Sequence, residues 1–177
     1  MQLFRAMFQK GWGKSEMNES LIEPTGVNLL LRGSVLRVCD TSMYFDSGLD
    51  IEMPPGEYSI AAIFDEAGEP IGFEAKQSNQ ESTGEPVGEV TFAFGQIGMF
   101  DKHQADRCFE MMPDMEMFFS QLQNDLQYGC IELNDVVQVP YFRCAEGAAV
   151  VYRLLDKEKA IGILLEFGYP DENGGEA

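Results

Sequence analysis

Residues 51–76, IEMPPGEYSIAAIFDEAGEPIGFEAK, decide the fold of this 177-residue chain. Pro54-Pro55-Gly56 predicts a rigid corner, because proline holds φ near −65° and glycine accepts backbone angles that other residues avoid. Beyond it, apolar and polar residues alternate on both sides of an acidic turn at 65–69. Such alternation around a turn is typical of two antiparallel strands. We therefore predict a β-hairpin over residues 58–75.

A second hairpin is predicted near the C-terminus. The segments AAVVYRLL and AIGILLEF flank a charged turn at 156–159 and are almost continuously apolar, so we expect them to be central strands. Residues 27–39 predict another hairpin, or two closely spaced strands, around 32–34. Further strands are expected at 89–94, 131–133 and 136–142, the last at a sheet edge because of Pro140. Residues 77–88 have the composition of a loop.

The expected helices lie in the middle of the chain. Residues 102–111 predict one helix, and Pro113 predicts the start of a second that Tyr128-Gly129 ends. The predicted fold class is therefore α+β, a predominantly antiparallel β-sheet or barrel-like core with a helical insertion around residues 102–128. We predict a single domain over 1–177, with an N-terminal appendage (1–26), a β-rich core (27–167) and an acidic tail (168–177).

Composition indicates a folded protein outside the membrane. An apolar fraction of 45% is higher than in disordered acidic chains. No apolar run approaches the roughly 20 residues of a membrane-spanning helix. The start, MQLFRAMFQKGWGK, lacks the features of a secretory signal, so we predict a cytoplasmic protein. The four cysteines are scattered without a CxxC pair and are expected to be reduced and buried.

Charge is the strongest compositional signal. The chain has twelve Lys and Arg residues and 30 Asp and Glu residues, which gives a net charge of −18. The excess is carried by residues 40–101 (thirteen acids, one base) and 102–177 (fourteen acids, six bases). Nucleic-acid binding is disfavoured, since phosphate contact needs clustered Lys and Arg. A basic protein partner is the natural complement, although acidity also serves solubility.

Candidate partner-binding residues follow from this charge. Carboxylates on and after the first hairpin would steer a basic partner, and exposed aromatic side chains would supply affinity. The candidates are Asp65, Glu66, Glu69, Glu74, Glu81, Glu85, Tyr44, Phe45 and Trp12.

Enzymatic and metal sites have weaker signals, and we assign no catalytic residue, metal or cofactor. His103, the only histidine, lies near Asp101, Asp106 and Cys108, but a surface histidine in the first turn of a helix is the simpler interpretation. A zinc set of His103, Cys108, Cys130 and Cys144 lacks short ligand spacing. A calcium set of Asp40, Asp46 and Asp50 lacks the alternating acidic loop.

Three alternative functions stay open. The first is a hydrolase-type enzyme that uses carboxylates and His103. The second is a structural or scaffolding subunit that docks through the amphipathic residues 1–8, and the third is a nucleic-acid mimic. The sequence leaves the oligomeric state undefined.

Several short motifs resemble a bacterial family of unknown function. They are Gly33-Ser34-Val35 through Asp40, Met53-Pro54-Pro55-Gly56-Glu57-Tyr58, Gly98-Met99-Phe100-Asp101 and a closing hairpin from Glu146-Gly147 to Glu166-Phe167. The chain departs from the family pattern in the order of Gly33-Ser34 and in Ala148-Ala149, where a tyrosine is expected. The family supplies no agreed catalytic residues.

Proteins of this kind are similar to the small acidic immunity proteins of bacterial toxin systems. The resemblance implies a protein that binds and blocks a cognate toxin, often a basic nuclease. It implies a toxin domain as the basic partner.

Overall fold

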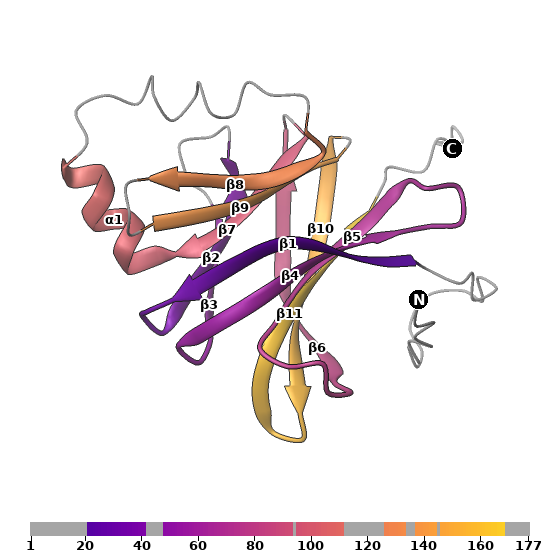
Figure 1. Ribbon diagram of the computed structural model, residues 1–177, viewed down its shortest axis with the longest axis horizontal. Helices are drawn as coiled ribbons and strands as arrows, with labels where there is room; N and C mark the ends of the chain where they lie inside the picture. Colours follow the sequence, from indigo (N-terminus) through magenta and orange to yellow (C-terminus); the bar gives the residue numbers. More distant parts are fainter. Residues whose placement is uncertain are drawn as a thin grey trace, which may run out of the picture.

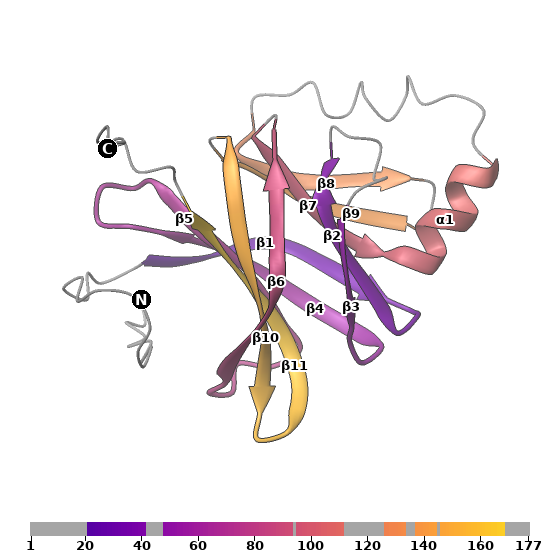
Figure 2. The same ribbon diagram turned by 180° about the vertical axis from the view of Figure 1, so that it is seen from behind.

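The computed structural model describes residues 21–41, 48–93, 95–111, 126–133, 137–144 and 146–168. The elements are β1 (Leu21–Leu31), β2 (Val35–Asp40), β3 (Gly48–Glu52), β4 (Gly56–Phe64), β5 (Pro70–Lys76), β6 (Thr83–Phe92), β7 (Gln96–Asp101), α1 (Lys102–Met111), β8 (Tyr128–Leu133), β9 (Val137–Arg143), β10 (Gly147–Asp156) and β11 (Lys159–Gly168). A six-stranded sheet has the order β1-β4-β5-β11-β10-β6, and a five-stranded sheet has the order β3-β2-β7-β9-β8 (Figures 1 and 2).

The predicted α+β class is wrong. Over the described ranges every strand pairing is antiparallel and α1 is the one helix. It occupies the first part of the predicted helical insertion, whereas residues 112–125 lie outside the described residues. Tyr128 and Gly129 begin β8 instead of ending a helix. Residues 128–133 pair with β9 along their whole length, and this pairing decides their conformation.

The first predicted hairpin is confirmed as β4 and β5, which pair across Ala62 and Phe73. Asp65 forms the turn, because its Oδ1 accepts hydrogen bonds from the backbone amides of Ala67 (2.9 Å) and Glu69 (2.8 Å). Asp side chains commonly hold turns in this way.

The corner before β4 is also built as its residues predict. The Tyr58 hydroxyl donates a hydrogen bond to the Pro54 carbonyl (2.5 Å), and the Gln77 side-chain amide donates to the Pro55 carbonyl (3.2 Å). Gly56 has a φ of 150°, and a Cβ there would lie 2.4 Å from the Gln77 amide nitrogen. The Gln77 side chain can shift, but glycine is the residue that adopts this φ without strain.

The C-terminal hairpin is confirmed as β10 and β11, which occupy interior positions in the six-stranded sheet. The loop predicted at 77–88 is shorter than expected, because β6 begins at Thr83 and pairs with β10 from there. Likewise β1 begins at Leu21, six positions before the predicted core. In both strands a proline lies within the paired segment, which an edge strand tolerates.

Strands β1 and β2 do not form a hairpin. β1 belongs to the six-stranded sheet and β2 to the five-stranded sheet, so residues 32–34 carry the chain from one sheet to the other. Asp101 holds this corner: its Oδ2 accepts hydrogen bonds from the backbone amides of Arg32 (2.7 Å) and Gly33 (2.6 Å).

One hydrophobic core lies between the two sheets, with inward-facing side chains from both. Phe142 of β9 is fully buried at its centre. Its ring centroid lies 5.4 Å from that of Phe73, 5.6 Å from Phe167 and 6.4 Å from Phe64, all on the six-stranded sheet. Tyr128 of β8 stacks on Phe142 at 6.2 Å. Tilted aromatic contacts at these distances are favourable beyond the area they bury.

The five-stranded sheet is also buried on its outer side. Phe100, Ile131 and Tyr141 are each at most 2% exposed there, and α1 packs against β2, β7 and β9. Pro140 was expected at an edge, but β9 lies between β7 and β8. The ladder between β7 and β9 ends at the pair of Gly98 and Tyr141. No residue of β7 pairs with Pro140, so the amide hydrogen that proline lacks is not needed in this ladder.

We predict that Phe142→Ala lowers the free energy of unfolding by about 4 kcal/mol, the range for removing a buried phenylalanine. Urea denaturation followed by near-ultraviolet circular dichroism measures this change. Thr91→Ala, on the exposed side of β6, should shift it by less than about 0.5 kcal/mol. Equal effects of the two substitutions would contradict the central role of Phe142.

Candidate functional site

The outer face of the six-stranded sheet is the best candidate for an interaction surface. Helix α1 covers the other sheet, and no described element forms a layer over this face (Figures 1 and 2). Antiparallel sheets that pack on one side normally expose alternating polar residues on the other. This face departs from that pattern, because it carries a cluster of apolar side chains.

The apolar cluster lies on β10 and β11. Leu154, Ile161 and Leu164 are between 5% and 9% exposed, and Ile63 and Tyr152 pack beside them, half-buried. Gly162 allows β5 and β11 to approach closely here, since a Cβ would lie 2.4 Å from the Ala75 carbonyl oxygen. These side chains form a small satellite of the main core.

Charged groups border this apolar cluster. Partial burial raises the pKa of Glu74, and Lys76, whose Nζ lies 3.9 Å from the Glu74 carboxylate, acts against that rise. The pKa of Tyr152 is also raised, first by burial and then by Glu166, with which its hydroxyl forms a hydrogen bond. Desolvation of a carboxylate disfavours its charged form. The charged form of Glu74 is therefore destabilised in the folded protein, and a cation placed beside it would stabilise that form.

The predicted acidic candidates do not converge on one site. Asp65, Glu66 and Glu69 lie together at the tip of the β4–β5 hairpin, and Glu74 lies on the outer face. Glu81 and Glu85 belong to the connection into β6 and its first part, away from the hairpin tip (Figure 1). Glu85 also accepts a hydrogen bond from Arg153 (2.6 Å). The aromatic candidates Tyr44, Phe45 and Trp12 lie outside the described residues.

Exposed charge in the described ranges is strongly asymmetric. Three basic side chains are exposed, Arg32, Lys157 and Lys159, against fourteen acidic ones. The exposed acids are Glu23, Asp50, Glu52, Glu57, Glu66, Glu69, Glu81, Glu85, Glu89, Asp106, Glu132, Glu146, Glu158 and Glu166. The negative field therefore belongs to the folded body.

His103 is exposed in the first turn of α1, and its neighbouring acids have other partners. Asp101 is 3% exposed and caps the helix by accepting a hydrogen bond from the Gln104 amide, besides holding the β1–β2 corner. Asp106 pairs with Lys102 (2.5 Å). Cys108 is five positions along the helix, and positions five apart lie on different helix faces. Its side chain lies outside what the structure describes.

The hypothetical metal sets are not assembled among the described residues. Asp40 is buried and accepts a hydrogen bond from the Ala93 amide (2.8 Å), while Asp50 pairs with Arg37 (2.6 Å); Asp46 lies outside the described residues. Burial raises the pKa of Cys130 to about 11 and that of Cys144 to about 12. Both thiols are therefore poor sources of the thiolate that zinc binds.

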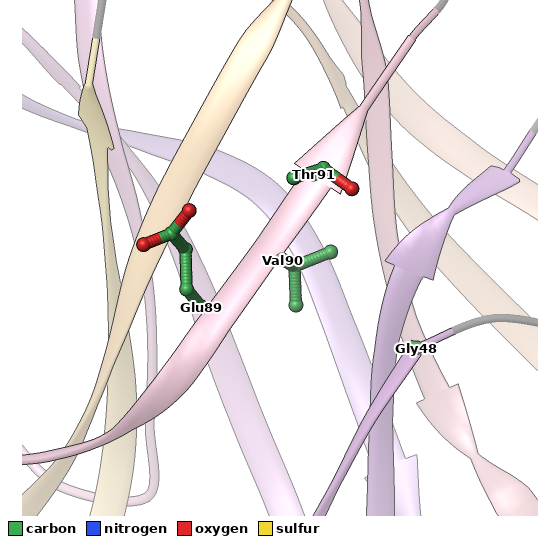
Figure 3. A pocket seen from close by; sticks show the side chains of 4 residues that line it. All are labelled: Gly48, Glu89, Val90 and Thr91. Carbon is green, nitrogen blue, oxygen red and sulfur yellow. The ribbon is translucent and has the colours of Figure 1, made fainter.

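A crevice of about 130 Å³ lies where the two sheets meet between β6 and β3. Figure 3 shows Val90 and Thr91 of β6 toward Gly48 at the start of β3, with Glu89 extended toward β10. A Cβ on Gly48 would lie 2.6 Å from the Val38 carbonyl oxygen, so this glycine serves close packing. The polar groups do not converge as they do in ligand-binding pockets.

Residues from three of the short motifs noted in the sequence make structural contacts. Gly33 binds Asp101, Asp40 binds Ala93, and Tyr58 closes the corner at Pro54. These contacts fix turns and connections between strands. They account for the residue types without a catalytic role.

Sequence reasoning missed Leu21 and Ile22, which are large apolar side chains at 50% and 38% exposure. Pro24-Thr25-Gly26 has the composition of a loop, so the strand β1 was not predicted to extend back to Leu21 and Ile22. The available signal was an apolar pair that a single residue, Glu23, separates from Pro24, a pattern that an edge strand allows.

Comparison with protein-family models, curated proteins and solved structures finds no match for the chain. Within the described ranges no helix has the length and apolar character needed to cross a membrane.

We predict that Asp101→Ala lowers the free energy of unfolding by about 3 kcal/mol, because it removes a helix cap and two amide hydrogen bonds at the corner. Chemical denaturation measures the loss. The exposed Asp106→Asn, which removes an ion pair on the same helix, should cost less than about 1 kcal/mol. A similar small loss for both variants would show that Asp101 does not hold the corner.

We predict a pH-dependent effect of Glu74→Gln. The folded-state pKa of Glu74 is raised, so its contribution to stability is fully present below the unfolded-state pKa and is lost as pH rises through the folded-state value. The variant should therefore exceed the wild type in free energy of unfolding at pH 7, and this advantage should shrink toward pH 4. Urea titrations at both pH values measure it. A variant less stable at pH 7 would mean that attraction to Lys76 outweighs burial.

Proposed function

We propose that this protein is an acidic binding protein for a basic protein partner. More specifically, we propose an immunity-type inhibitor that neutralises a bacterial toxin in the cytoplasm by stoichiometric occlusion. The observation that carries the proposal is the fourteen-to-three excess of exposed acidic over basic side chains among the described residues of a two-sheet body. The proposal that the basic partner is a toxin rests on the resemblance to acidic immunity proteins.

The mechanism has an electrostatic and a contact part. A body with this surface charge raises the encounter rate with a basic partner, because the fields of the two proteins attract before contact. Affinity then comes from apolar side chains that lose water at the interface. The exposed apolar side chains of Leu21 and Ile22 on β1, with the exposed Glu23 beside them, offer both kinds of contact.

The candidate carboxylates differ in how freely they can serve a partner. Glu66 and Glu69 are exposed at a hairpin tip whose shape Asp65 maintains. Glu85 would have to give up Arg153, and a charged group that exchanges one partner for another gains little. We therefore assign Glu66 and Glu69 the largest share of the contact charge among the acidic candidates.

Enzymatic chemistry has less support from the described residues. A hydrolytic site needs acid and base groups that face a common enclosed volume. Among the described residues that line the crevice beside Gly48, Glu89 is the one ionisable group, and His103 is not among them. Binding, by contrast, needs a surface of matched charge.

The test is co-purification with the tagged full-length chain from the native cell, followed by measurement of the isolated partner. We predict a basic toxin whose activity is abolished at one equivalent, with an association rate constant at least about tenfold lower at 0.5 M than at 0.05 M NaCl. Glu66→Gln/Glu69→Gln should slow association more than the charge-matched Glu146→Gln/Glu158→Gln. Salt-independent association, or a partner that stays active when saturated, would overturn the proposal.

A further inference from the structure

The two edges of the six-stranded sheet differ in a way that points to a binding mode. Each edge strand contains four consecutive exposed residues, Leu21–Pro24 in β1 and Thr83–Pro86 in β6. We call these segments the β1 margin and the β6 margin. An edge strand presents backbone groups that another chain can pair with, and native proteins usually blunt such edges with polar residues, charge or proline.

The β6 margin is blunted in this manner. Its residues are Thr, Gly, Glu and Pro, and Glu85 is engaged by Arg153. The β1 margin has a proline too, but it exposes Leu21 and Ile22. Three of the four large apolar side chains that are exposed in the described ranges lie on β1, namely Leu21, Ile22 and Leu30.

A bulge separates the β1 margin from the rest of its strand. Pairing with β4 shifts register between Pro24 and Asn28, where Gly26 has a φ of 74°. The Thr25 hydroxyl stabilises the bulge by donating to the Ile60 carbonyl (2.9 Å) and accepting from the Val27 amide (3.1 Å). After the bulge, β1 resumes a normal alternation of exposed and buried residues.

The margin therefore projects away from the packed body. Both views show the start of β1 beside the β4–β5 hairpin tip, extending beyond the five-stranded sheet (Figures 1 and 2). Leu21 pairs with Phe64, the residue directly before the hairpin turn, and the exposed acids of this region are Glu23, Glu66 and Glu69. Its unpaired side is thus an apolar edge in acidic surroundings.

We propose that the β1 margin binds an extended, basic segment of the partner as an added strand. The inference rests on the proposed function and specifies its geometry. A second copy of the chain is the wrong occupant, because two bodies of charge −18 repel one another. A cationic segment is complementary to the carboxylates, and main-chain pairing on an open edge supplies a defined register.

The register of β1 also defines the side chains that fit. Ile22 pairs with Ile63, whose side chain belongs to the apolar cluster of the outer face, whereas Glu23 pairs with Ala62, which faces the core side. Side chains of an added strand alternate between the same two sides. The segment therefore alternates apolar residues toward Ile22 with basic residues toward Glu23.

The probe for the test is a fluorescent seven-residue peptide of alternating lysine and valine, added to the full-length protein. We predict saturable binding by fluorescence anisotropy and, by NMR, slowed hydrogen exchange at those amides of residues 21–23 that face away from β4. Ile22→Thr, which keeps strand propensity and removes apolar surface, should weaken binding about tenfold. A peptide of alternating glutamate and valine should not bind.

Two matched variants make the result specific. Leu126→Thr removes another exposed apolar side chain, and Thr83→Ala alters the β6 margin; neither should change peptide affinity by more than about twofold. Binding without protection of the β1 margin would overturn the strand-addition mode and leave the acidic binding function intact. Outward-facing amides of the margin that are already protected in the free protein would overturn it too, since the edge would be occupied. Absence of any cationic partner in the co-purification would instead overturn the proposed function.

Discussion

Contact between the two sheets through Phe142 is the interaction on which the rest of the structure depends. A single ring from the five-stranded sheet lies among Phe64, Phe73 and Phe167 of the other sheet. These three residues come from both hairpins that the sequence makes most evident. The inner face supplies most of the apolar burial that stability requires, and the outer face adds only a small satellite cluster. A surface that is not needed for folding is available for contact with another molecule.

Buried carboxylates define where the chain passes between sheets. Asp101 holds the amides of the β1–β2 corner, and Asp40 holds Ala93 at the end of β6. These two carboxylates thus stabilise connections between strands by accepting hydrogen bonds from backbone amides, and such charge-assisted hydrogen bonds are strong. The exposed acids are a separate population, and net charge alone does not distinguish the two. Burial and hydrogen bonds do.

The hairpins were predictable because their signals are local. Alternation around Asp65 and the apolar runs before and after residues 156–159 specify strands, and the Pro54-Pro55-Gly56 corner specifies its own geometry. The assignment of strands to sheets was not predictable, because β1 and β2 are separated by three residues yet belong to different sheets. The corner between these strands is held by hydrogen bonds to Asp101, about 70 positions along the chain. The exposed side chains of the β1 margin were missed because exposure depends on which strand lacks a neighbour.

The prolines of the two margins lie at opposite ends of one line of paired residues, which runs from Pro24 through Ala61, Glu74, Leu164 and Tyr152 to Pro86. Each proline removes one amide donor from its strand. Copies of the chain therefore cannot stack edge to edge into an uninterrupted fibre through this line. A strand added from a partner also finds no amide donor at Pro24, which limits the length over which it can pair. A closed, one-to-one complex is the assembly that this geometry favours.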